Sequence, residues 1–176
     1  GMKEAAEVVG GILVGAFRKH LSIIQCFEDG RDIYGDFRNA YVSLKEKTKS
    51  GVKDGLVHIG RALHKIPDAL KDCKGVSETI AQIRKIAVIF SNPTLLTVNV
   101  GKNIIWHGVD IFKNVQGAIS AYQHNNWFSM GDHIGTIMDI VFLRNKNFKD
   151  VQNNDGTEFL TGFAHGVSPY TYTQVS

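Results

Sequence analysis

The chain has 176 residues, of which 43% are hydrophobic, and its 20 basic and 17 acidic residues give a net charge of +3. This length suits a single domain with a continuous core. The modest charge argues against a nucleic-acid-binding protein, because such proteins carry dense basic patches. One basic run has no aromatic residues interleaved, and we interpret it as a solvated helix end; it consists of Lys45, Lys47, Lys49 and Lys53.

Apolar residues recur with helical spacing almost throughout, and no stretch alternates apolar with polar residues long enough for a strand. We therefore predict an all-α protein: a compact bundle of five to seven helices with a glycine-rich first helix and a long helix that begins at Pro93. The apolar run Val8 to Phe17 is far shorter than the roughly 20 residues that span a bilayer, so no transmembrane segment is expected.

In the first half of the chain, the spacing predicts helices over residues 3–20, 21–47 and 52–65. The sequence Lys49-Ser50-Gly51 separates the second from the third. Pro67 fits the first turn of a further short helix that ends at Asp72, since a proline there lacks only a donor that would have no partner. Ser77 is the predicted N-cap of the next helix, which ends near residue 90.

In the second half, Asn92 is the predicted cap of a helix over residues 93–124, with Pro93 at its first position. Asn126 is the predicted cap of a last helix that ends at Arg144. The bundle domain would then comprise residues 1–144, followed by a polar linker over 145–156 and a glycine-bearing C-terminal segment over 157–176.

One helical pattern, an acidic residue with glycines four and eight positions later, occurs at both ends of the chain. The copies start at Glu7 and Glu158, and their glycines are Gly11, Gly15, Gly162 and Gly166. Glycines one turn apart let another helix approach closely, and Gly131 and Gly135 offer a matching face on the last predicted helix. The C-terminal copy is either a closing helix of this bundle or the start of a further repeat.

The two cysteines, Cys26 and Cys73, are 47 positions apart, which fits neither a redox pair nor a zinc site. In an exported protein they would form a disulfide, and in a cytosolic protein they would be buried thiols. The residues alone leave both alternatives open.

No nucleophile motif or phosphate loop is present, and we expect no cofactor. A metal site is a minor hypothesis: His107 and Asp110 share a helix face, and Asp132 would have to complete the set from the last helix. Three aromatic residues near helix ends are candidates for partner binding, namely Trp106, Trp127 and Phe128.

Several segments together resemble a group of uncharacterised, apparently secreted, all-helical repeat proteins of ciliates and other protists. They are Ile59 to Cys73, Ser91-Asn92-Pro93, Asn103 to Gly108, and Ala121 to Gly131. The resemblance covers most of residues 4–144. It implies export, a bridge between Cys26 and Cys73, and a repeat unit, and it carries no catalytic residue.

The sequence therefore favours a non-enzymatic structural or protein-interaction module that is secreted or lumenal, whose partner is a protein, either a second copy or another chain. Two alternatives remain open. The first is a carrier of a lipid or small apolar ligand between helices. The second is a metal-dependent enzyme that uses the helix-borne histidine and aspartates.

Overall fold

The computed structural model describes residues 1–28 and 30–143, and the side chains of residue 31 and of residues 99–107 lie outside this description. All regular elements within it are helices, which confirms the predicted fold class. They are α1 (Met2–Phe17), α2 (Arg31–Leu44), α3 (Lys49–Ala69), α4 (Ser77–Phe90), α5 (Pro93–Gln123), α6 (Trp127–Met138) and a π-helical turn η1 (Asp139–Leu143).

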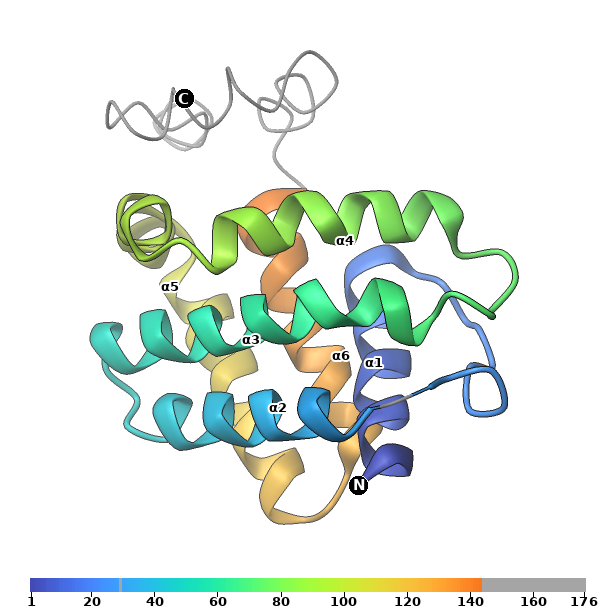
Figure 1. The fold of residues 1–176 in the computed structure, drawn as a ribbon. Coiled ribbons are helices and arrows are strands. Elements are labelled where there is room, and N and C mark those ends of the chain that lie inside the picture. Colours follow the sequence, from blue (N-terminus) through green and yellow to red (C-terminus); the bar gives the residue numbers. More distant parts are fainter. Residues whose placement is uncertain (29, 144–176) are drawn as a thin grey trace.

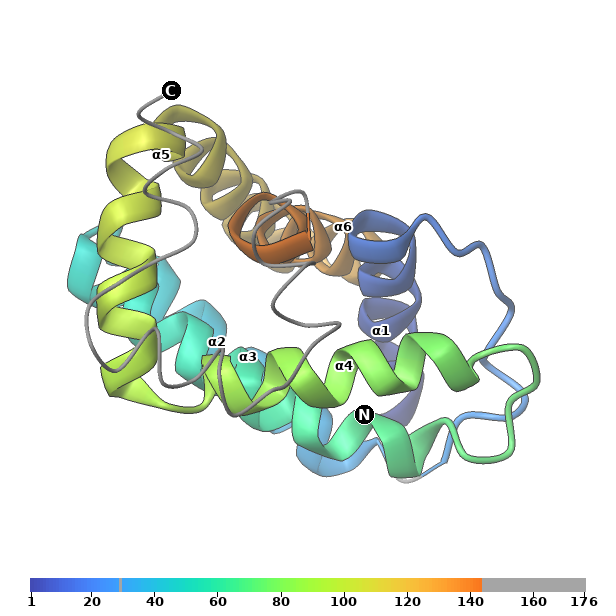
Figure 2. The same cartoon turned by 90° about the horizontal axis from the view of Figure 1, so that it is seen from above.

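The helices form two layers that cross at a steep angle. Helices α2, α3 and α4 run side by side in one layer, and α1 and α6 lie against its inner face (Figure 1). Helix α5 connects the layers along one side of the molecule (Figure 2). Because α3 lies between α2 and α4 and also contacts α5, its apolar residues are enclosed on several sides.

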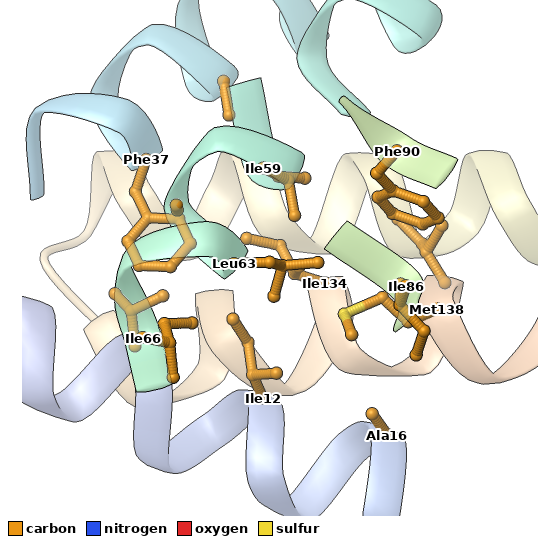
Figure 3. Close-up of a cluster of buried hydrophobic side chains, with 14 of the residues drawn as sticks. Ile12, Ala16, Phe37, Ile59, Leu63, Ile66, Ile86, Phe90, Ile134 and Met138 are labelled. Carbon is orange, nitrogen blue, oxygen red and sulfur yellow. The ribbon is translucent and has the colours of Figure 1, made fainter. Parts of the chain in front are cut away.

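The core fills the space between the layers with aliphatic and aromatic side chains. Ile12 of α1 and Ile134 of α6 point toward Leu63 of α3, and all three are fully buried (Figure 3). Farther along, Phe90 of α4 packs against Phe142 of η1, with their ring centroids 5.2 Å apart. Each such side chain stabilises the fold by about 1.5–3 kcal/mol through burial, so the core holds the two layers together.

Local capping fixes where two helices begin, as the sequence predicts. The Asn92 side chain accepts hydrogen bonds from the backbone N–H groups of Thr94 and Leu95, at 3.0 and 3.2 Å. Asn126 accepts one from Ser129 at 3.2 Å. These side chains satisfy N–H groups that have no partner inside the helix, so both predicted starts are confirmed.

The predicted helix over residues 21–47 is wrong in its first third. Helix α1 ends at Phe17, after which Arg18 adopts a left-handed conformation with φ 55°, and the described residues between α1 and α2 form no helix. Ile23 and Phe27 are buried from this irregular segment, whereas Ile24 is 55% exposed. Apolar residues at helical spacing do not form a helix here. Ile23 and Phe27 are buried because the irregular segment packs against the bundle, and not because they line one side of a helix.

Three other boundaries also differ from the prediction. Lys49-Ser50-Gly51 forms the first turn of α3, with Thr48 as its cap, and no break occurs before Pro67. Pro67 lies in the last turn of α3, and because it has no backbone N–H it removes one hydrogen bond from that turn. Helix α4 starts at Ser77 itself, and Val76 is its N-cap without a side-chain hydrogen bond. The last predicted helix becomes η1 after Met138.

Candidate functional site

A disulfide ties the irregular segment between α1 and α2 to the end of α3. It joins Cys26 and Cys73, whose Cα atoms are 5.2 Å apart. The backbone N–H of Glu28 also donates a hydrogen bond to the carbonyl of Ala69, at 3.0 Å. These two links hold the irregular segment against the bundle without regular secondary structure.

A polar pocket of about 550 Å³ opens beside the disulfide. It is lined by Glu28, Asp32, His64, Lys65, Asp68, Ala69 and Lys71. Much of its charge is already paired: Lys65 Nζ lies 2.8 Å from Asp36 Oδ2, and Lys71 Nζ lies 3.8 Å from Glu28 Oε2. These pairs involve both lysines of the lining, whereas Asp32 and Asp68 take part in no ion pair within the described part of the chain.

Two carboxyl groups meet at the rim of this pocket. A hydrogen bond that the protonated Glu28 carboxyl donates to Asp72 raises the pKa of Glu28 above its ordinary value, and repulsion between the two charges adds to this effect. The Lys71 ammonium works in the opposite direction. Among the described residues, no group of three or more His, Cys, Asp or Glu side chains could hold a metal ion, here or elsewhere.

Helices α1 and α6 pack backbone against backbone through four glycines. A Cβ atom added to Gly131 would overlap the Val8 carbonyl and lie 2.9 Å from the Ile12 backbone nitrogen. One added to Gly135 would lie 2.7 Å from both the Ala16 nitrogen and the Ile12 carbonyl oxygen. Gly11 and Gly15 face the α6 backbone in the same way.

The other predicted glycines, Gly162 and Gly166, lie outside the described residues, as do the proposed linker and C-terminal segment. Three glycines of α3 also have a role in helix packing. Gly51 and Gly55 face α2, and Gly60 faces the end of α4. The spacing of Gly51 and Gly55, four residues apart, is the same signal that marks the α1 face.

An aromatic cluster joins α2 to the corner between α5 and α6. Tyr41 stacks on Tyr122 with centroids 4.0 Å apart, and Trp127 meets both Tyr34 and Tyr122 edge-on, at 5.7 and 5.3 Å. All four rings are half-buried. Gln123 donates a hydrogen bond to the Tyr41 hydroxyl at 3.2 Å.

The cluster continues on the surface as a mixed basic and apolar strip. Lys45 Nζ lies over the Tyr41 ring at 5.6 Å from its centroid, and Arg38 is exposed between Tyr34 and Tyr41 in the helical register. Val42 beside them is 45% exposed. Lys45 therefore has an aromatic neighbour in space, although no aromatic residue lies between the lysines of the basic run in the sequence.

We call this surface the tyrosine face and define it by its members. They are Tyr34, Arg38, Tyr41, Val42 and Lys45 of α2, with Tyr122, Gln123 and Trp127 of the corner. The sequence analysis does not single out Tyr34 and Tyr41 as site residues. The missed signal is the spacing of positions 34, 38, 41 and 45, which puts two tyrosines and two cations on one side of a helix.

The predicted partner-binding aromatics are not brought together among the described residues. Trp127 belongs to the tyrosine face, whereas the ring of Phe128 lies near Gly10 of α1 and is 47% exposed. The Trp106 and His107 side chains lie outside the described residues. Of the other metal candidates, Asp110 is exposed on α5 and Asp132 is half-buried on α6 beside Gly15.

His58 of α3 is half-buried, and its Nδ1 has no hydrogen-bond partner within the described part of the chain. Burial is the main cause that lowers the pKa of His58 below its ordinary value of 6.5, and the nearby Arg61 charge adds to it. Asp36 and Asp54 oppose this shift. The folded protein therefore resists protonation of this ring more than the unfolded chain does.

This shift predicts a pH dependence of stability. The unfolded state takes up a proton near pH 6.5, before the folded state does, so the free energy of unfolding should fall as the pH drops below about 6.5. The contribution of His58 to the free energy of unfolding is fully present above that pH. Urea unfolding at several pH values from 5 to 8 should show a shallower decline for His58→Gln than for the wild type. His20→Gln, at an exposed position, serves as control, and equal slopes for all three proteins would contradict the prediction.

A family model described as SctB-like, secreted protein B-like, matches residues 3–143. The chain belongs to this family. No curated protein and no solved structure gives a significant match to the chain. The family description and the disulfide both indicate an exported protein, as the sequence predicts.

The SctB-like match supports only one part of the resemblance, namely that the chain is of a secreted type. It indicates a secreted type of protein, and it names neither a ciliate or protist group nor a repeat architecture. Among the described residues, no helix is long and apolar enough to cross a bilayer.

Proposed function

We propose that this SctB-like protein is an exported, non-enzymatic interaction module that binds a protein partner through the tyrosine face. The observation that carries the proposal is the composition of that face: three tyrosines, a tryptophan and an arginine lie on it together with the exposed Val42. Tyr, Trp and Arg are the residues that contribute most binding energy at protein interfaces.

Rigidity also supports a binding role. The rings are held by stacking, by edge contacts and by the Gln123 hydrogen bond, so they lose little conformational freedom when a partner binds. The disulfide and the backbone contact between α1 and α6 hold the supporting bundle together. Such a scaffold presents a preformed surface.

The same surface is compatible with the repeat or assembly role that the sequence suggests, in which the partner is another unit of the same kind. The lipid-carrier and metal-enzyme alternatives gain no supporting observation from the described residues. We therefore propose neither of them.

Fluorescently labelled protein should bind saturably to the extracellular material of the cells that secrete it, and unlabelled protein should compete. Val42→Asp should weaken this binding by about tenfold or more, because it removes apolar surface from the tyrosine face and puts a carboxylate one helical turn from Arg38. Val88→Asp on α4 is a matched control, since Val88 is 44% exposed and also helical. The absence of saturable binding, or equal effects of both substitutions, would overturn the proposal.

A further inference from the structure

The tyrosine face carries positive charge without compensating acids of its own. Along α2, the positions that share this surface are 34, 38, 41, 42 and 45, and they hold two cations and no carboxylate. The nearby Asp36 is buried and paired with Lys65 at 2.8 Å, so its charge does not neutralise the face. Beyond the end of α2 the exposed Glu46 is outnumbered by the exposed Lys47 and Lys49, so the region remains positive.

The ring geometry decides what kind of anion this face suits. Tyr122 covers one side of the Tyr41 ring at 4.0 Å, and the Lys45 ammonium stands over the same ring at 5.6 Å. That ring is therefore already engaged by a second ring and by a cation. Nucleic-acid bases and sugar rings bind to aromatic side chains by stacking on an open ring face. A ring that already has two such partners is less suited to this kind of stacking.

The exposed side chains of the tyrosine face are suited to binding the carboxylates of a protein. Arg38 presents a planar guanidinium that can bind a carboxylate with two hydrogen bonds, and Lys45 adds a second cation about two turns along the helix. Val42 supplies apolar area between them. An acidic segment that also bears aliphatic side chains would match this arrangement of charge and apolar surface.

We propose that the partner of the tyrosine face is an acidic protein segment, with Asp or Glu side chains that pair with Arg38 and Lys45 and an aliphatic side chain that covers Val42. This inference rests on the proposed binding function and specifies its partner. Charge complementarity across the interface would speed association and make the affinity dependent on salt.

The test uses the full chain and a fluorescein-labelled synthetic peptide composed of aspartate, glutamate and leucine. Fluorescence anisotropy should show saturable binding that weakens on going from 50 to 200 mM salt, and an analogue with asparagine and glutamine in place of the acids should not bind. Arg38→Glu/Lys45→Glu should weaken binding by about tenfold or more. The matched control Lys3→Glu/Arg84→Glu makes the same change of charge at exposed positions on α1 and α4 and should bind like the wild type.

Other outcomes would overturn the inference. They are equal losses in the two double variants, tighter binding of single-stranded DNA or of a sulfated polysaccharide than of the acidic peptide, and self-association detected by sedimentation in place of peptide binding.

The test also separates the two proposals. If Val42→Asp abolishes binding to extracellular material but Arg38→Glu/Lys45→Glu does not, the binding function stands and the acidic partner is wrong. Circular dichroism and thermal melts must show that each variant is folded.

Discussion

Replacing Gly131 with alanine is expected to lower the free energy of unfolding by about 3 kcal/mol, equivalent to a fall of roughly 10 °C in Tm for a protein of this size. The added Cβ would overlap the Val8 carbonyl and lie 2.9 Å from the Ile12 nitrogen. Both are backbone atoms of α1, so no side chain can rotate away to relieve the clash. The two helices would have to separate, and the buried side chains beside them would lose contacts.

A matched substitution shows whether the effect comes from the contact or from glycine itself. Gly35 lies within α2, and a Cβ atom added there would meet no other atom within 4 Å. Gly35→Ala should therefore stabilise the protein by about 0.5–1 kcal/mol, because alanine restricts the unfolded chain and favours helix. Thermal and urea unfolding measure both variants. If Gly131→Ala is as stable as Gly35→Ala, helices α1 and α6 do not pack in this way.

Removing the disulfide is expected to have the second large effect. The bridge joins residues 47 positions apart, and the chain-entropy model gives about 4 kcal/mol for closing a loop of that length. In Cys26→Ser/Cys73→Ser the irregular segment keeps the buried Ile23 and Phe27, so the fold should persist with reduced stability. Guanidinium unfolding of the two proteins gives the difference directly.

Reduction of the wild-type protein provides an independent route to the same quantity. A reductant should shift the unfolding midpoint of the wild type to that of the serine variant and leave the variant itself unchanged. Thiol titration confirms that the bridge has opened. The prediction fails if the reduced wild type shows two free thiols but keeps its unfolding midpoint. In that case the bridge adds no stability.

Helix starts that depend on a local cap could be predicted from the sequence. Asn92 with Pro93, and Asn126 at the start of α6, act on backbone groups only two or three residues away, so the neighbouring sequence is sufficient. The segment that contains Ile23, Ile24 and Phe27 could not be predicted in this way. Its burial pattern depends on contacts with the distant end of α3, which no local periodicity reports.

The tyrosine face also combines features that can be predicted locally with features that only the fold decides. Tyr34 and Tyr41 could be placed on one side of a helix from their spacing, but their neighbours Tyr122 and Trp127 lie more than 80 residues away in the chain. Only folding shows that these rings meet near the surface with Arg38 and Lys45 beside them. Local spacing therefore indicates the five α2 members of the tyrosine face, and only the tertiary structure adds the three from the corner between α5 and α6.

The amino-acid sequence by itself determined the all-α class, the long helix from Pro93 and the glycine pattern of α1, because periodicity, capping and small residues act within one or two helical turns. The tertiary structure decided which glycine faces meet and how the segment before α2 is held. It also decided which exposed side chains gather into one surface. These features depend on contacts between residues far apart in the chain, and such contacts are set by the packing of the whole core.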